Sequence, residues 1–174
     1  MAEQHNNSVS IERIETPSIV SLKVSIKSLE SARDKLQLAL PSRATVGDPR
    51  SLWLGPGQWL LVSKSTAPEV IVRNCEEALA GILHNAVDYS AGLAVLRIAG
   101  PNARQLLATG SGIDFRPEKF QAQTCCRTRL AQIPAVIVAE EPEQFDIYVD
   151  RSYETYLNEW LQEASSIAAV ATSF

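Results

Sequence analysis

The order in which helical and strand-like patterns follow one another constrains this chain more than any other feature of its sequence. Residues 18–27 alternate between apolar and polar side chains, which predicts a half-buried strand. Apolar residues then recur at helical spacing from Leu29 until Pro41 ends the pattern. Two short strands around a turn at 55–57 follow, before a second helix that begins at Pro68. Pairs of strands that a hairpin can join thus separate the predicted helices.

The second half of the sequence repeats this plan. Strand candidates lie at residues 86–90, 93–99, 124–131, 134–139 and 145–149. Gly100-Pro101 opens a helix that Gly110 stops, and Ser152 caps a final helix with a wide apolar stripe. Because hairpins join antiparallel strands, we predict an α+β fold made of duplicated strand–helix–strand–strand units with antiparallel or mixed sheets.

The length of 174 residues and the 45% share of hydrophobic residues suit one domain with a sizeable core. We expect a single α+β domain over residues 16–165, a disordered tail over 1–15 and a C-terminal tail over 166–174. The polar N-terminus has no pattern of a secretory signal, and no apolar run reaches the ~20 residues of a membrane span. We therefore expect a cytoplasmic protein that does not enter membranes.

Charge and composition argue against several kinds of function. Sixteen basic and twenty acidic residues give a net charge of −4, whereas nucleic-acid binding needs a basic surface. Two His and three Cys are few for a zinc site. The net charge is uneven, at +3 over residues 86–131 and −7 over residues 132–163. Such patches either favour docking to a complementary protein or form an ordinary solvated face.

The three cysteines, Cys75, Cys125 and Cys126, are odd in number and two are adjacent, so we expect reduced thiols rather than a disulfide framework. Cys125 and Cys126 fall in a predicted strand, where neighbouring side chains point to opposite faces. One thiol should then be buried and the other exposed. Arg127 and Arg129 would lower the pKa of the outward thiol, which leaves a reactive cysteine as the alternative to two structural ones.

Other reactive side chains lack partners at a useful spacing. His84 lies at the predicted end of the helix that begins at Pro68, where it would interact with the helix dipole. Asp88 and Asp114 are candidate general bases, although no neighbouring residue completes a catalytic pair with either of them. We therefore predict no catalytic, cofactor-binding or metal site on this chain.

Two glycine-containing segments are weak candidates for anion binding. Residues 100–102 (Gly-Pro-Asn) open a helix whose N–H groups could hold an anion, but Pro101 removes one donor and the glycine pattern of a nucleotide loop is absent. Residues 110–112 (Gly-Ser-Gly) are explained equally well as a helix stop followed by a loop. Neither segment predicts a site by itself.

Trp53 and Trp59 flank the predicted hairpin turn. If they are exposed, their large rings are good anchors for a partner protein. The alternative is that they belong to the core. Together with Arg127 and Arg129, we take these two residues as the predicted partner interface.

One longer segment resembles a known superfamily. Residues 87–90 read VDYS, and residues 95–107 read VLRIAGPNARQLL. This order resembles the aminomethyltransferase-like folate-binding superfamily, in which a D-x-S strand leads into l-x-l-x-G-P-x-A-x-x-L-L. The resemblance implies a fold like the N-terminal, folate-binding domain of these transferases.

More narrowly, the chain resembles the gamma subunits of heterotetrameric sarcosine oxidases. The supporting segments lie at residues 54–62, 112–115, 128–134 and 145–153, with Tyr156-Leu157 and Trp160-Leu161 after them. Their order and spacing are together more specific than any one segment. The resemblance covers residues 87–163 and the segment 54–62.

This resemblance implies a non-catalytic structural or assembly subunit of an oxidoreductase. Oxidative demethylation of sarcosine to glycine, with one-carbon transfer to tetrahydrofolate, would then take place on the partner alpha, beta and delta subunits. The resemblance places FAD, FMN, NAD and tetrahydrofolate on those partners and none on this chain.

Two other functions stay open from the sequence. The region of Asp88 and Gly100-Pro101 would suit a stand-alone tetrahydrofolate-binding protein related to the aminomethyltransferases. The pair Cys125-Cys126 would suit a thiol-dependent enzyme. Binding of reduced folates and the pKa values of the thiols distinguish these functions from a subunit without its own chemistry.

Overall fold

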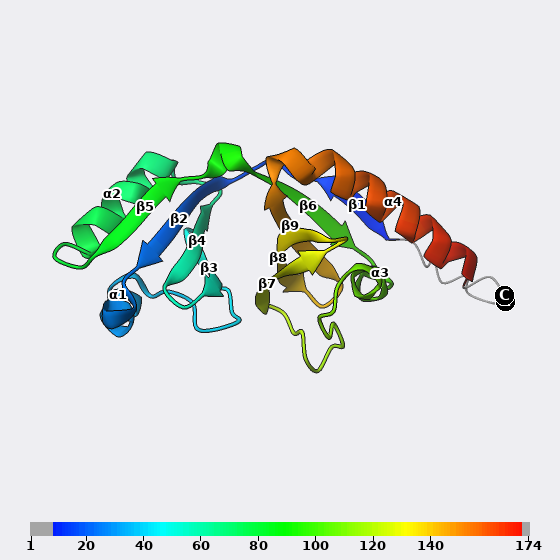
Figure 1. The fold of residues 1–174 in the computed structure, drawn as a ribbon, viewed down its shortest axis with the longest axis horizontal. Coiled ribbons are helices and arrows are strands. Elements are labelled where there is room, and N and C mark those ends of the chain that lie inside the picture. The colour runs from blue at the N-terminus through cyan, green and yellow to red at the C-terminus, as the bar shows by residue number, and fades with distance from the viewer. Residues whose placement is uncertain (1–8, 172–174) are drawn as a thin grey trace. The chain divides into compact units, whose positions relative to one another are not determined.

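The structure is a computed structural model that describes residues 9–171 (Figure 1). The chain divides into two compact units. Unit 2 consists of Glu15–Leu93 and Gln123–Arg127. Unit 1 consists of Ala94–Ala122 and of the described parts of Met1–Ile14 and Thr128–Phe174.

Unit 2 is built on a four-stranded antiparallel sheet with the strand order β3-β4-β2-β5. Its elements in chain order are β2 (Ser18–Val24), η1 (Ile26–Ser28), α1 (Leu29–Leu36), β3 (Arg50–Gly55), β4 (Gln58–Ser63), α2 (Pro68–Ala78), β5 (His84–Asp88) and η2 (Ser90–Gly92). The β-α-β-β-α-β order is that of a split βαβ motif. The predicted alternation of helices with strand pairs is confirmed here.

The core of unit 2 lies between this sheet and its two helices. Val20, Leu22 and Val24 are alternate residues of β2 and therefore share one face of the sheet. They are buried in one apolar cluster with Ala32 of α1 and Ile71 of α2. The helices therefore cover the same face of the sheet, as expected for this motif.

The β3–β4 hairpin depends on a glycine. Gly57 has φ +69°, and a Cβ built on it would lie 2.5 Å from the carbonyl oxygen of Val24. Only glycine combines this backbone conformation with so close an approach. The Gly57 carbonyl in turn accepts the Val24 N–H at 2.9 Å, so the turn is fixed to the end of β2.

Both helices of unit 2 end earlier than the sequence pattern predicts. The helix α1 stops at Leu36, because Gln37 takes a left-handed conformation with φ 49°. The next residues, Leu38 and Ala39, are buried outside the helix, so their apolar spacing reflects tertiary packing. The helix α2 stops at Ala78, and the prediction of a helix that continues to His84 is wrong.

Most of the second sheet belongs to unit 1. It has five strands in the order β1-β6-β9-β8-β7, and the β1–β6 and β8–β9 pairs are antiparallel. Its strands are β1 (Ser10–Arg13), β6 (Leu93–Ala99), β7 (Cys125–Leu130), β8 (Ile133–Glu141) and β9 (Gln144–Asp150). The helical elements are α3 (Ala103–Gly110), η3 (Arg151–Tyr153) and α4 (Glu154–Ala171). The predicted strand–helix–strand–strand order recurs here as β6, α3, β7 and β8.

Regular secondary structure extends into both predicted tails within the described residues. Strand β1 lies within residues 1–15, which we predicted as a tail, while residues 1–8 lie outside the described residues. Helix α4 extends to Ala171, past the predicted domain end at 165. The prediction that Ser152 caps the final helix is wrong. Asp150 is the N-cap residue of η3, and its carboxylate accepts the Ser152 N–H at 3.0 Å.

Unit 1 contains a buried ion pair between β6 and β9. The Arg97 Nε donates to Asp146 Oδ1 at 2.6 Å, and its Nη2 donates to Oδ2 at 2.8 Å. Asp146 is 3% exposed, and its hydrogen bond to Arg97 raises the pKa of that guanidinium. This bidentate geometry pairs the buried carboxylate with a guanidinium whose side chain is 22% exposed.

A second arginine ties loops of unit 1 to α3. Arg104 donates through Nη1 to the carbonyls of Phe115 at 2.6 Å and Phe120 at 2.8 Å, and through Nε to that of Pro142 at 2.9 Å. Its guanidinium lies 5.1 Å from the ring centroid of Phe145. Burial lowers the pKa of Arg104. These contacts fix the segment that follows α3.

Among residues 9–171, no helix is both long enough and apolar enough to span a membrane.

Candidate functional site

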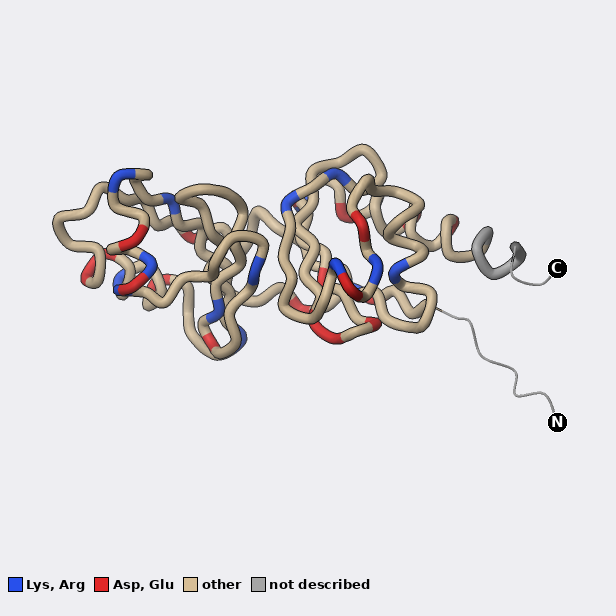
Figure 2. The backbone as a smooth tube through the Cα atoms, turned by 90° about the horizontal axis from the view of Figure 1, so that it is seen from below, with Lys and Arg blue, Asp and Glu red and all other residues tan. Residues whose placement is uncertain are grey.

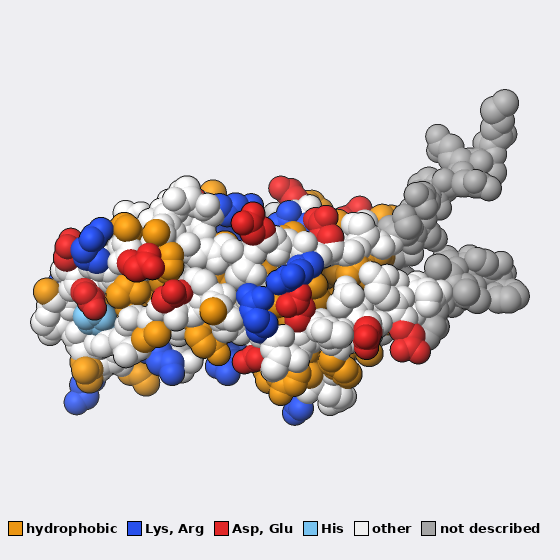
Figure 3. Space-filling model, turned by 90° about the horizontal axis from the view of Figure 1, so that it is seen from above, with side chains coloured by type: hydrophobic (Ala, Val, Ile, Leu, Met, Phe, Trp, Pro, Cys, Tyr) orange, Lys and Arg blue, Asp and Glu red, His pale blue; other side chains and the backbone are white. Residues whose placement is uncertain are grey.

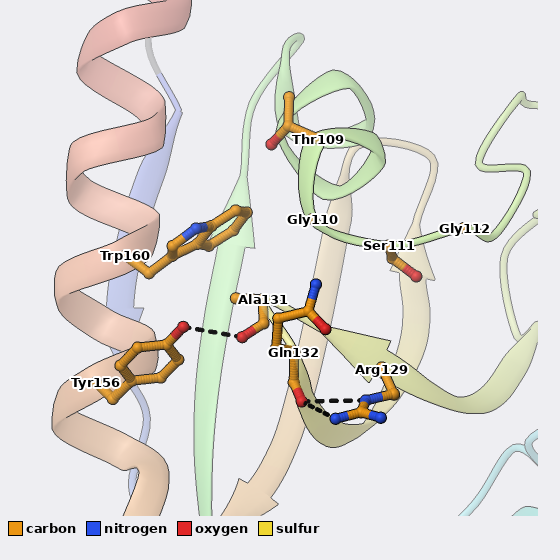
Figure 4. Close-up of a pocket in the computed structure, with 9 residues that line it drawn as sticks. All are labelled: Thr109, Gly110, Ser111, Gly112, Arg129, Ala131, Gln132, Tyr156 and Trp160. Atoms are coloured by element: carbon orange, nitrogen blue, oxygen red, sulfur yellow. Dashed lines mark hydrogen bonds between the residues drawn. The ribbon is translucent and has the colours of Figure 1, made fainter.

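The best candidate for a functional site is a pocket of about 420 Å³ within unit 1 (Figure 4). Three segments meet there: the end of α3, the β7–β8 turn and the first turns of α4. The lining residues are Thr109, Gly110, Ser111, Gly112, Arg129, Ala131, Gln132, Tyr156 and Trp160. A volume of this size lies within the range of about 300–1,000 Å³ that small-molecule pockets usually have.

The approach of α4 to α3 requires a glycine at the end of α3. The Trp160 ring projects from α4 toward Gly110 (Figure 4). A Cβ built on Gly110 would collide with the Cη2 atom of this ring and would also lie 3.1 Å from Leu130. Gly110 therefore does more than stop a helix, because its missing side chain makes room for one wall of the pocket.

The β7–β8 turn is held in an unusual conformation. Ala131 and Gln132 both have positive φ values, 49° and 71°, which non-glycine residues seldom adopt. The Ala131 N–H donates to the Gly110 carbonyl at 2.9 Å, and the Tyr156 hydroxyl donates to the Ala131 carbonyl at 2.9 Å. Contacts to α3 and to α4 thus stabilise the turn, and such strained positions are frequent at binding sites.

Arg129 supplies the positive charge of the pocket. Its Nε and Nη2 donate to the Gln132 carbonyl at 3.1 and 2.6 Å (Figure 4). The side chain is exposed, and no described carboxylate lies within ion-pair distance of it. The guanidinium is therefore oriented by the turn rather than by an acidic partner.

The lining suits binding rather than proton transfer. It contains no Asp, Glu, His or Cys, so it offers no acid–base pair and no thiolate. The Thr109 hydroxyl donates to Leu106 at 2.7 Å, and the Ser111 hydroxyl lies 3.4 Å from that of Thr128. Elsewhere in residues 9–171, no three His, Cys, Asp or Glu side chains come together as metal ligands.

The structure separates the cysteines from the pocket. Cys125 is fully buried, with its Sγ 3.4 Å from the Trp53 carbonyl, while Cys126 is partly exposed, so the opposite orientation of the two thiols is confirmed. Cys75 lies buried on α2, where burial raises the pKa of its thiol to about 11. Neither Cys75 nor Cys125 is accessible as a nucleophile.

The three other candidates for acid–base chemistry have local partners. His84 lies in β5, with Nδ1 2.8 Å from the Ile82 carbonyl, so its predicted place at a helix end is wrong. The Asp88 carboxylate accepts the Ser90 N–H and hydroxyl at 2.9 and 2.6 Å. Hydrogen bonds from Arg116 lower the pKa of Asp114 to about 2, which makes it a weak base.

The four residues of the predicted interface differ in exposure. Trp59 is 1% exposed and donates through Nε1 to the Ala39 carbonyl at 3.0 Å. The alternative of a core tryptophan is thus the one that the structure supports for Trp59. Trp53 is partly buried, whereas Arg127 and Arg129 are exposed on β7. These three stay predictions as partner contacts.

Internal contacts account for part of the acidic stretch at 132–163. Figure 2 shows that acidic and basic residues occur in both units. Asp146 is buried against Arg97, whereas Asp150 stays exposed and keeps its charge. Glu154 pairs with Arg13 at 2.6 Å. The surface that remains for docking is therefore less acidic than the sequence suggests.

Sequence reasoning did not find the pocket. Tyr156 and Trp160 appeared as part of an apolar helix stripe, and residues 110–112 as a helix stop. The only sequence signal was the pair of Gly110, which has no side chain, and Trp160, whose large ring can fill the space beside it. That pairing links positions 50 residues apart, so no local pattern reveals it.

Comparisons with known proteins assign this fold. A sequence profile of the sarcosine oxidase gamma subunit family matches residues 29–167. The chain is 28% identical over 115 residues to the sarcosine oxidase subunit gamma of Corynebacterium sp. (strain U-96), covering 66% of this chain and 55% of that relative. It is 27% identical over 124 residues to that of an Arthrobacter sp., covering 70% and 59%. The alignments thus span little more than half of these relatives.

Solved structures give the same fold. A chain of the heterotetrameric sarcosine oxidase from Corynebacterium sp. U-96 superposes with a TM-score of 0.81 at 22% identity, covering 92% of this chain and 85% of that one. The aminomethyltransferase T of the glycine cleavage system from Bartonella henselae superposes with a TM-score of 0.64 at 15% identity, covering 90% and 46%. The predicted α+β, aminomethyltransferase-like fold is confirmed.

The fold and the pocket define a class: an α+β protein of the aminomethyltransferase-like fold with a pocket in unit 1 whose lining contains no Asp, Glu, His or Cys. Within this class, the chain belongs to the sarcosine oxidase gamma subunit family, whose profile matches it over most of its length.

Proposed function

We propose that this chain is a non-catalytic structural or assembly subunit of a heterotetrameric sarcosine oxidase. Its membership of the gamma subunit family over residues 29–167 carries the proposal. The fold match to a chain of the Corynebacterium enzyme, which extends over 92% of this chain, supports it. Since the curated relatives are longer, the activity, substrate and partners all belong to the proposal.

In this proposal the chemistry takes place on the partner alpha, beta and delta subunits. These subunits hold FAD, FMN, NAD and tetrahydrofolate, and they convert sarcosine to glycine with transfer of the one-carbon unit to tetrahydrofolate. The pocket lining supports this division, because it lacks an acid–base pair. The assembly works in the cytoplasm, where the three free cysteines stay reduced.

The surface of unit 2 supports a role in assembly. Among the described residues, six of the eight exposed large hydrophobic side chains lie in unit 2, including Ile26 at 72% and Leu83 at 79% exposure. The Ser25 N–H donates to the Leu83 carbonyl at 2.9 Å, so these two side chains lie on neighbouring segments. Figure 3 shows hydrophobic side chains at the surface of this unit. Clustered exposed apolar residues are typical of interaction surfaces.

Co-purification tests the proposal directly. The full chain, tagged at one end, is co-expressed with the alpha, beta and delta subunits of the same organism. We expect a stable complex that contains flavin and oxidises sarcosine, whereas the chain purified alone is colourless and inactive. Failure to associate with any of the co-expressed subunits would overturn the proposal.

A double substitution sharpens this experiment. Ile26→Ser with Leu83→Ser removes two exposed apolar side chains without disturbing the core. We expect less alpha and beta subunit in the purified complex, while Val46→Ser, which is also exposed at 76%, serves as the matched control. The proposed interface residues Trp53, Arg127 and Arg129 can be tested in the same way.

The structure favours the two alternatives less. The carboxylate of Asp88 accepts hydrogen bonds from Ser90 in a local turn. Of the two features that suggested a folate site, Asp88 and Gly100-Pro101, the structure therefore explains Asp88 by a local role. Calorimetry of the isolated chain with reduced folates tests that function. A thiol-dependent enzyme would need a nucleophile at Cys125 or Cys126, and only Cys126 is partly exposed. A thiol titration against pH tests it.

Residues 16–165 stay our proposed domain limits.

A further inference from the structure

The unit 1 pocket has more hydrogen-bond donors than acceptors that bind them. The Gln132 carbonyl takes only the Nε and Nη2 side of the Arg129 guanidinium. The end of the fork, formed by Nη1 and Nη2, keeps a parallel pair of N–H groups, because an arginine carries five donors. The Trp160 indole N–H has no acceptor among the described residues, and it lies on the opposite wall (Figure 4).

We propose that this pocket binds a small organic acid, with the carboxylate on the free end of the Arg129 fork and the organic part against the Trp160 ring. Two parallel N–H groups match the two oxygens of a carboxylate. The lining contains no acidic side chain that would repel an anion or compete for the arginine.

The site is already arranged before a ligand arrives. Arg129 is oriented by two hydrogen bonds to the turn, and the turn itself is held by Gly110 and Tyr156. Trp160 has its position against Gly110, where any side chain would displace it. Less conformational entropy is therefore lost on binding than with a free arginine side chain.

One feature opposes an anion at this place. The C-terminal end of α3 carries a partial negative charge of about half an elementary charge. The Gly110 carbonyl at this end already accepts the Ala131 N–H, and Arg129 contributes a full positive charge. The balance thus still favours an anionic ligand, although it predicts modest affinity.

Nuclear magnetic resonance of the ¹⁵N-labelled full chain tests the proposal. The three tryptophans give three indole N–H signals, and Trp160→Phe identifies that of Trp160. Benzoate serves as the probe, with benzamide as its neutral analogue and inorganic phosphate as the alternative anion. We expect benzoate to shift the Trp160 indole signal in a saturable way at millimolar concentration, and benzamide to bind at least about ten-fold more weakly.

Matched arginine variants show which cation is responsible. Arg129→Gln should weaken benzoate binding about ten-fold or more, while Arg127→Gln, a second exposed position of the same strand outside the pocket, should leave it unchanged. Equal binding by Arg129→Gln, equal binding of benzamide, or tighter binding of phosphate would each overturn the proposal. Unchanged backbone signals elsewhere confirm that the variants are folded. Because the titration uses this chain alone, its failure would leave the proposed subunit role untouched.

Discussion

The two units stabilise their sheets by different means. Unit 2 encloses an apolar cluster between one sheet face and two helices, and its interior hydrogen bonds join neutral groups: the Trp59 indole donates to the Ala39 carbonyl, and the buried hydroxyls of Ser51 and Ser63 accept backbone N–H groups. Unit 1 buries the charged pair Arg97–Asp146 and uses Arg104 to hold three loop carbonyls. The comparison shows that the unit with the candidate site is also the one that buries a charged group, Asp146.

This difference has a physical reason. A neutral interior tolerates small shifts, whereas a buried charge is stable only while its partner stays in place. The pocket requires the end of α3, the β7–β8 turn and α4 to keep fixed positions. Unit 2 instead exposes six of the eight described large apolar side chains that face solvent.

The largest effect is expected from the ion pair of unit 1. Asp146→Ala leaves the Arg97 guanidinium without its partner in a largely buried place, so we expect a loss of about 3–5 kcal/mol in unfolding free energy by urea denaturation. The double variant Arg97→Met with Asp146→Leu should recover most of that loss. Asp114→Ala, in an exposed arginine pair, should change little; a similar loss there would refute the distinction between the pairs.

The pH dependence of unfolding tests how much the core of unit 2 destabilises a thiolate at Cys75. Its folded pKa of about 11 lies above the ordinary value of 9.0, because burial disfavours the thiolate. The resulting stabilisation is complete below pH 9 and is lost as the pH rises from 9 to 11, by roughly 2–3 kcal/mol. We expect urea denaturation to show this decline in the native chain and a flatter profile in Cys75→Ala. Identical profiles would contradict the assignment.

The two tryptophans of the hairpin give the next effect. Trp59→Phe leaves the buried Ala39 carbonyl without its donor, so we expect a loss of about 1–3 kcal/mol in unfolding free energy. Trp53→Phe, at a partly buried position, serves as the matched control and should be close to neutral. If both variants lost the same amount, the stability of unit 2 would not depend on the hydrogen bond of the Trp59 indole.

The smallest effect is expected at the pocket wall. Gly110→Ala forces the Trp160 ring away from α3, at a cost of about 1 kcal/mol, since the partly exposed ring can move. The Trp160 indole signal should shift and benzoate binding should weaken. Gly112→Ala has no atom within 4 Å of its added Cβ and should change neither. An unaltered Trp160 signal in Gly110→Ala would argue against close packing of the Trp160 ring on Gly110.

The sequence predicted elements well where local patterns decide them. Strand β6 was predicted with its observed bounds, Leu93–Ala99, because an apolar run lies between two glycines. The end of α1 was misplaced because Leu38 and Ala39 are buried by tertiary contacts that imitate helical spacing. Strand β1 was missed because only one of its four side chains is even partly buried, so it carries no alternating pattern.

The candidate site could be predicted only in fragments. Arg129 was selected for its charge, and the glycines at 110 and 112 as a loop. What joins them is the positive-φ turn at Ala131 and Gln132, whose residue types give no hint of that conformation. Contacts from α3 and α4 maintain it, and these form only in the folded chain.

The pairing of β1 with β6 has a consequence during protein synthesis. Ser10 faces Ala99 and Arg13 faces Leu96. Strand β1 therefore stays unpaired until β6 has been synthesised, some 80 residues later. At ribosomal rates of about 5–20 residues per second, this delay is roughly 4–16 s. Glu15–Leu93 of unit 2 leave the ribosome within that interval. The charges of Glu12 and Arg13 discourage the waiting strand from pairing with other nascent chains.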